Sequence, residues 1–99
     1  MLTQRAASRM VQPPAWIQWC VDARQVTIID RACAKAYVLS GLQAAAWNWF
    51  TLGYSRPKVI EMVSSAGPQS LAAADVLVRS MISDWMANGL LEEKRNHDH

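Results

Sequence analysis

The chain has 99 residues, of which 52% are apolar and 18% are charged, and its net charge is +2 at neutral pH. This length and composition predict one small globular domain, and they exclude a disordered chain and a disulfide-rich scaffold. The mild charge argues against a nucleic-acid-binding face, and the apolar runs are far shorter than the ~20 residues that cross a bilayer. No secretory signal is visible, so we expect a cytoplasmic protein with no membrane partner.

The N-terminal segment, residues 1–12, is polar and small with no sustained hydrophobic period, which predicts a flexible arm. Pro13 and Pro14 end this arm because their φ angles are fixed. The folded domain is therefore expected over residues 13–92. Residues 93–99 are predicted to form a charged C-terminal tail, since they contain no apolar anchor.

Three short segments after the prolines have the composition or the alternation of strands. Residues 16–21 combine tryptophan with β-branched side chains, residues 25–30 contain four β-branched side chains in a row, and residues 34–39 alternate between two faces. Residues 22–24 and 31–33 provide the turns. The three segments therefore predict an antiparallel meander.

The hydrophobic period then changes from two residues to about 3.6 residues, which predicts three helices within residues 40–90. Gln43 stands where the capping-box partner of a helix beginning after Ser40 would stand. The expected N-caps are Ser40, Ser55 and Ser70, and the expected ends are Gly53, residues 64–68 and Gly89.

Each expected helix has an apolar stripe that should face a common core, and Leu90 and Leu91 can fold back onto that core. The stripes comprise Leu42, Ala45, Ala46, Trp49 and Leu52, then Val59, Ile60 and Val63, and finally Ala74, Val78, Met81 and Trp85. Strands followed by helices predict an α+β domain, with a three-stranded antiparallel sheet and the helices on one of its faces.

Residues that could carry catalysis are few and poorly placed. His97 and His99 lie in the charged tail, which cannot hold a catalytic base in a fixed position. Cys20 and Cys33 have no histidine nearby in the fold to activate them, and two cysteines are too few for a four-ligand zinc site. We interpret both as small core or turn residues and expect no enzyme activity, no metal and no cofactor.

The five tryptophans divide between the core and the surface. Trp49 and Trp85 lie on apolar stripes and are expected in the core. Trp16 and Trp19 point to opposite faces of a strand, so at most one of them can face the helices. Trp47 is about 200° from Trp49 around the first helix, which predicts partial exposure.

An edge strand of the predicted sheet is the best functional feature that the residues themselves provide. Such an edge can accept an extended peptide, whose main-chain hydrogen bonds give affinity while side-chain contacts give selectivity. Lys35 on the third strand either blunts this edge against aggregation or contacts the peptide.

Several runs in the sequence resemble the PqqD family. These are residues 26–30, residues 36–40, the Ala-rich residues 43–47, residues 55–60, and a third-helix pattern of Asp75, Val78, Met81, Ile82, Trp85, Gly89 and Leu90. Together they cover roughly residues 16–91. The resemblance implies a winged-helix-like recognition element for ribosomally synthesised, post-translationally modified peptides (RiPPs). Such a domain is not an enzyme: it holds the leader segment of a precursor peptide as an added strand and presents it to a modifying enzyme.

The resemblance also implies where the leader peptide binds, namely between the third strand and the third helix. The implied docking strand comprises Ala34, Lys35, Ala36, Tyr37, Val38 and Leu39, and the implied helix contacts are Asp75, Arg79, Ile82 and Met86. The implied partners are the leader peptide and a radical SAM enzyme, a leader peptidase or a cyclase.

Two other functions remain open from the sequence. A winged-helix DNA-binding protein has a similar order of elements, but the third helix sets Arg79 against Asp75 and Asp84, a poor surface for phosphates. The chain could instead be a small interaction subunit of an enzyme complex that uses exposed tryptophans. A salt titration separates the first of these from peptide binding, because DNA binding weakens steeply with salt.

Overall fold

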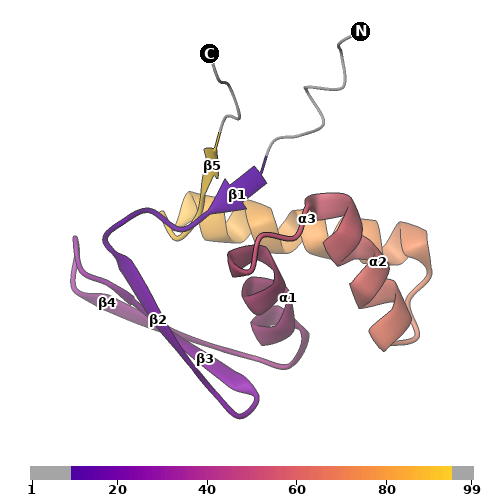
Figure 1. Ribbon diagram of the computed structural model, residues 1–99, viewed down its shortest axis with the longest axis horizontal. Coiled ribbons are helices and arrows are strands. Elements are labelled where there is room, and N and C mark those ends of the chain that lie inside the picture. The colour runs from indigo at the N-terminus through magenta and orange to yellow at the C-terminus, as the bar shows by residue number, and fades with distance from the viewer. Residues whose placement is uncertain (1–9, 95–99) are drawn as a thin grey trace, which may run out of the picture.

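The computed structural model describes residues 10–94 and confirms the predicted order of three strands and three helices (Figure 1). The antiparallel sheet has the order β2-β3-β4, and the helices lie together on one side of it. The elements are β2 (Ile17–Asp22), β3 (Gln25–Asp30), β4 (Lys35–Ser40), α1 (Gly41–Thr51), α2 (Arg56–Ala66) and α3 (Leu71–Ala87).

A second, two-stranded sheet corrects the prediction for both ends of the domain. Strands β1 (Met10–Gln12) and β5 (Glu92–Lys94) pair antiparallel, and the Val11 side chain is buried. The predicted arm and tail are therefore ordered at these positions. The reason is the burial of Leu90 and Leu91, which directs the chain after α3 back beside β1. The rest of the predicted arm and tail, residues 1–9 and 95–99, lies outside the described residues.

Strand β3 shows the predicted alternation most clearly, since Val26, Ile28 and Asp30 face the helices and are buried. Antiparallel pairing places Trp19 of β2 and Tyr37 of β4 on either side of Ile28. Side chains paired in this way point to the same face of a sheet. The register therefore identifies which residues of the two outer strands face the helical layer.

The turn between β3 and β4 is organised by the carboxylate of Asp30. Its Oδ1 accepts hydrogen bonds from the backbone N–H groups of Ala32 (2.9 Å) and Cys33 (3.4 Å), and its Oδ2 accepts one from the Cys33 thiol (3.1 Å). The thiol bond holds the pKa of Asp30 below its ordinary value and raises the pKa of Cys33. The interpretation of Cys33 as a turn residue is confirmed, whereas Cys20 is exposed on β2, contrary to the expectation of a core or turn position.

The predicted helix boundaries hold, with one difference at the first N-cap. The hydroxyls of Ser55 and Ser70 accept hydrogen bonds from backbone N–H groups in the first turns of α2 and α3. Ser40 precedes α1, but its side chain makes no capping bond, so the predicted capping box does not form. Gly53 and Gly89 follow α1 and α3 with φ angles of 100° and 76°, the left-handed geometry that favours glycine.

The core is centred on Trp47, which corrects the prediction for the first helix. Trp47 has an exposed fraction of 0%, whereas Leu52 of the predicted stripe is 66% exposed. Trp47 makes edge-to-face contacts with Trp19 of β2 and Trp85 of α3, at ring centroid distances of 5.8 and 5.4 Å. The prediction failed because α1 is covered from two sides, by the sheet and by α3, so more than one stripe is buried.

The core predictions for α3 are confirmed, and those for α2 are confirmed at two of three positions. Every member of the predicted α3 stripe, from Ala74 to Trp85, is buried, as are Val59 and Val63 of α2. Trp49 is only partly buried, at the margin of the core, and Trp16 is 48% exposed.

Candidate functional site at the free edge of β4

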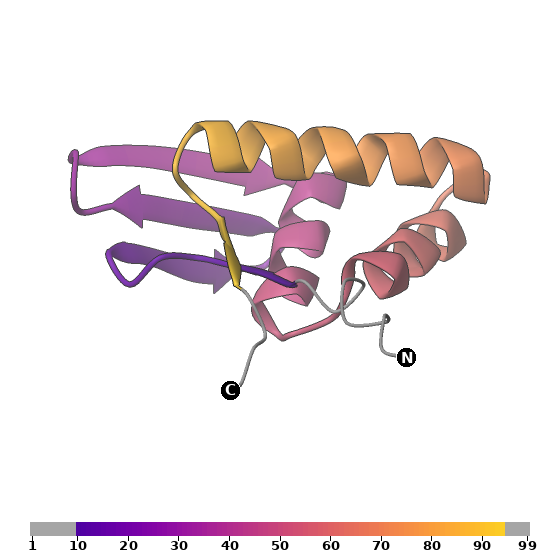
Figure 2. The same cartoon turned by 90° about the horizontal axis from the view of Figure 1, so that it is seen from above.

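Strand β4 is an outer strand of the three-stranded sheet, because only β3 pairs with it. In an antiparallel sheet, alternate residues of an outer strand direct their backbone N–H and C=O groups away from the neighbouring strand. These groups are available to an added strand. Figure 2 shows β4 at the margin of the sheet, on the side where α3 runs. Of the predicted docking strand, Ala34 lies in the preceding turn with a φ of 58°, and the other five residues belong to β4.

The two faces of β4 differ in what an added strand would meet. Lys35, Tyr37 and Leu39 share the face of the buried β3 residues, whereas Ala36 and Val38 point to the opposite, outward face. Along the inner face, Leu39 is buried, Tyr37 is half-buried and Lys35 is exposed. The burial therefore decreases from the α1 end of the strand toward the turn.

Strand β2, the other outer strand, shows the reverse gradient. On its inner face Ile17 is 4% exposed, Trp19 is 39% exposed and Val21 is 50% exposed. Since Ile17 and Lys35 lie at the same end of the sheet, the helices cover the sheet diagonally. Two corners of the inner face are left uncovered, the β4 corner (Lys35 and Tyr37) and the β2 corner (Trp19 and Val21).

Two of the four α3 residues of the implied site, Asp75 and Arg79, lie beside α2. The guanidinium Nε of Arg79 is 2.8 Å from the carboxylate of Asp75, and both residues line a surface hollow with Arg56 and Pro57 from the first turn of α2. Ile82 is buried in the core, and Met86 is 38% exposed. The structure thus places the Asp75–Arg79 pair beside α2.

The opposite flank of α3 contains an apolar side chain that the sequence did not single out. Leu77 is about 200° from Asp75 around the helix, so the buried stripe separates the two. Leu77 is partly buried and packs against the core, as Tyr37 does on β4. Sequence alone is a weak guide to Leu77, because it lies outside the main apolar stripe. Its flank can be assigned only when the side of α3 that packs against α2 is known.

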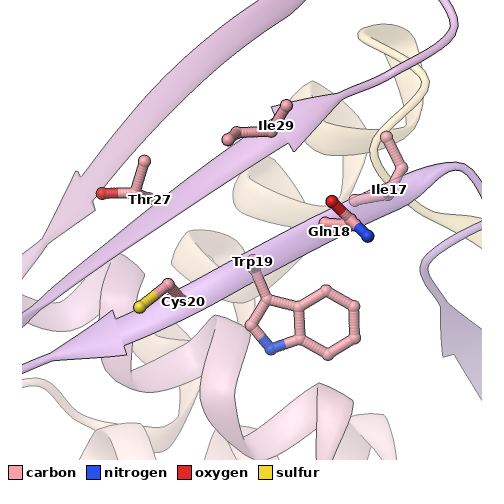
Figure 3. A pocket seen from close by; sticks show the side chains of 6 residues that line it. All are labelled: Ile17, Gln18, Trp19, Cys20, Thr27 and Ile29. Atoms are coloured by element: carbon pink, nitrogen blue, oxygen red, sulfur yellow. The ribbon is translucent and has the colours of Figure 1, made fainter.

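A hollow of about 460 Å³ lies between β2 and β3, and four of its six lining residues are on the outward face of the sheet (Figure 3). It is lined by Ile17, Gln18, Trp19, Cys20, Thr27 and Ile29, none of which is charged. Ile29 in this lining is 45% exposed, and Val38, which pairs with Thr27, is 61% exposed. The sequence predicted an uncovered face but not this hollow.

Little in the described residues suggests metal or membrane chemistry. Within residues 10–94 no group of three or more His, Cys, Asp or Glu side chains is placed to hold a metal ion. No helix in the same range is long and apolar enough to span a bilayer. The Asp30–Cys33 pair is committed to a turn, and His97 and His99 lie outside the described residues.

Comparisons with known proteins identify the fold. No family model and no curated protein matches the sequence. The structure of TbiB1 in complex with the TbiA(beta) leader peptide is similar to the chain, with a TM-score of 0.79, 9% identity, and coverage of 89% of this chain and 99% of that one. A lasso peptide synthetase B1 complexed with the leader peptide is also similar, with a TM-score of 0.77, 13% identity, and coverage of 83% and 96%. These likenesses confirm the fold that the PqqD-like resemblance implied.

Proposed function

We propose that this protein binds the leader segment of a ribosomally made precursor peptide as an extra strand on β4 and presents it to a modifying enzyme. One observation carries the proposal: the chain shares nearly the whole fold of two proteins whose structures contain a leader peptide, and in this fold β4 has a free edge. Strand addition satisfies the free backbone groups of an outer strand, which gives affinity without a deep cavity.

The β4 corner supports this mode because it provides both main-chain and side-chain contacts. Tyr37 is half-buried at the margin of the core, so a peptide side chain opposite it would gain apolar contact without displacing the core. On α3 we propose the flank of Leu77, because the flank of Asp75 and Arg79 is beside α2. Met86 stays an alternative contact, since its side chain is accessible at the C-terminal end of α3.

The role proposed here is recognition rather than catalysis. A binding partner needs only the strand edge and its side-chain contacts, and the chemistry is left to the modifying enzyme. The name of one similar structure, a lasso peptide synthetase B1, favours an enzyme of lasso peptide synthesis, such as a leader peptidase or a cyclase, over a radical SAM enzyme. A cytoplasmic location, where precursor peptides are made, belongs to the same proposal.

A winged-helix DNA-binding function finds less support in the charges of α3. Arg79 is paired with Asp75, and the exposed Asp84 lies on the same helix. These carboxylates oppose the phosphate contacts on which DNA affinity depends.

Calorimetric titration with the leader encoded beside this protein's reading frame tests the proposal. We expect saturable binding that persists as salt is raised from low to physiological concentration, because apolar and main-chain contacts are weakly screened. A duplex DNA of random sequence serves as the control ligand, and its binding should be weak and lost with salt. No binding of the leader by a protein with an intact melting transition would contradict the proposed function.

A further inference from the structure

Because burial along β4 decreases from Leu39 to Lys35, successive residues of an added peptide would meet different surroundings. Both strand pairs of this sheet are antiparallel, and in an added pair of the same kind the first residue of the peptide lies near the end of β4 that meets α1, with later residues toward the turn. Peptide residues opposite Leu39, Tyr37 and Lys35 share their inner face and occur at alternate positions in N-to-C order. The first two of these positions meet apolar surroundings, and the third meets an ammonium group.

The charges around Lys35 make this third position electrostatically distinct. Asp30 is directly opposite Lys35 on β3, but its carboxylate already accepts hydrogen bonds from Ala32 and Cys33 in the turn. Within the described residues, no carboxylate lies within 4.0 Å of the Lys35 ammonium. Arg31, which follows Asp30, is also exposed. Lys35 lies opposite Asp30 and Arg31 follows Asp30, so this end of the sheet has two cations and one carboxylate, and its net positive charge favours an acidic ligand.

We propose that this protein selects an extended peptide with two apolar side chains and then an acidic side chain at alternate positions, the acidic one opposite Lys35. The inference rests on the proposed strand addition at β4 and adds its direction and its charge preference. The apolar positions supply affinity, whereas the acidic position fixes the register, because a slip by one residue would turn all three side chains to the outward face.

A displayed library of random peptides tests the inference without knowledge of the natural leader. Wild-type protein should enrich the alternating apolar, apolar, acidic pattern, with the acid at its C-terminal end. Synthetic peptides from the enriched pool that differ only by glutamate or glutamine at that position should differ about threefold in affinity, as expected of an exposed cross-strand ion pair. The difference should shrink as salt is raised.

Variants of Lys35 give the decisive comparison. Lys35→Glu should change the preference at this position from acidic to basic side chains. If this charge reversal prevents folding, Lys35→Gln replaces it and should remove the preference. Lys58→Glu is the matched control, because Lys58 is an exposed lysine on α2 and its loss alters the net charge equally. This variant should keep the wild-type preference.

The possible outcomes separate this inference from the proposed function. Enrichment of alternating apolar residues with no charge preference, or with one that survives Lys35→Gln, would overturn the inference but leave strand addition in place. An acid enriched at the N-terminal end of the pattern would overturn the antiparallel direction. Failure to enrich any extended pattern would overturn the proposed function together with the inference.

Discussion

The two uncovered corners of the sheet differ although each belongs to an outer strand. At the β2 corner, Trp19 already contacts the buried Trp47 and Val21 is half exposed beside a hairpin. At the β4 corner, Tyr37 lies at the margin of the core and Lys35 is exposed at the turn end of the strand. A free backbone edge is therefore common to both strands, and our proposal of β4 for peptide binding depends on its side-chain context.

The largest expected effect concerns the helical layer that leaves these corners uncovered. Trp85→Ala should destabilise the fold by roughly 3–5 kcal/mol, because it removes a buried aromatic side chain in contact with Trp47. Chemical denaturation followed by circular dichroism measures this loss. Trp16→Ala is the matched control, since Trp16 is 48% exposed, and it should change stability by no more than ~0.5 kcal/mol. Equal midpoints for the two variants would contradict the assigned core.

The next effect compares the two corners directly. Tyr37 and Trp19 are aromatic residues on opposite sides of Ile28. Tyr37→Ala should weaken leader binding at least about tenfold, or ~1.4 kcal/mol, because it removes apolar contact with the added strand. Trp19→Ala should leave the affinity nearly unchanged, although it also loses packing. Calorimetric titration of both variants measures the two affinities, after each variant has been checked for folding. A larger loss for Trp19→Ala than for Tyr37→Ala would move the site to β2.

A smaller effect distinguishes the two flanks of α3. We expect Leu77→Asn to weaken leader binding several-fold, since Leu77 lies on the flank opposite the Asp75–Arg79 pair that borders α2, and Met86→Asn to have little effect. The substitutions introduce the same uncharged amide, so a difference between them reports position. If only Met86→Asn weakens binding, the helix side of the site is the Asp75–Met86 stripe that the family resemblance implied.

The smallest effect concerns the turn that begins β4. Cys33→Ala removes the thiol bond that lowers the pKa of Asp30, so it should reduce stability at neutral pH. Since the folded pKa of Asp30 is lowered, its contribution is lost as the pH falls below about 4. Since the folded pKa of Cys33 is raised, the contribution is also lost as the pH rises through that value, above about 9.

Thermal melting of wild type and Cys33→Ala across this pH range checks the prediction. The difference in melting temperature between the two proteins should be greatest between these two pH limits and should vanish outside them. A difference that does not depend on pH would mean that the thiol contributes through packing and not through its bond to Asp30.

The sequence was sufficient for features set by local periodicity. The alternation of β3 and the regular stripe on α3 each predicted which side is buried, and the caps Ser55 and Ser70 predicted where helices begin. Features that depend on packing between layers were not predicted. Trp47 was expected to be partly exposed because its helix was treated as covered on one side, whereas two layers cover it.

The candidate site also combines features that depend on local sequence with features that depend on how the helices pack. That β4 is an outer strand could be predicted from chain order in a meander, although the choice of β4 over β2 came from the family resemblance. The helix contacts could not, since the flank of α3 that borders α2 depends on how the helices cross. The pairing of β1 with β5 likewise joins segments from opposite ends of the sequence, so no local pattern predicts it.

Hydrogen–deuterium exchange of individual backbone amides, with and without the leader peptide, tests the central claim most directly. Strand addition on β4 should slow the exchange of those amides in residues 35–40 that point away from β3, and it should leave the outer amides of β2 unchanged. Protection confined to β2, or saturable leader binding with no protection in β4, would contradict the account.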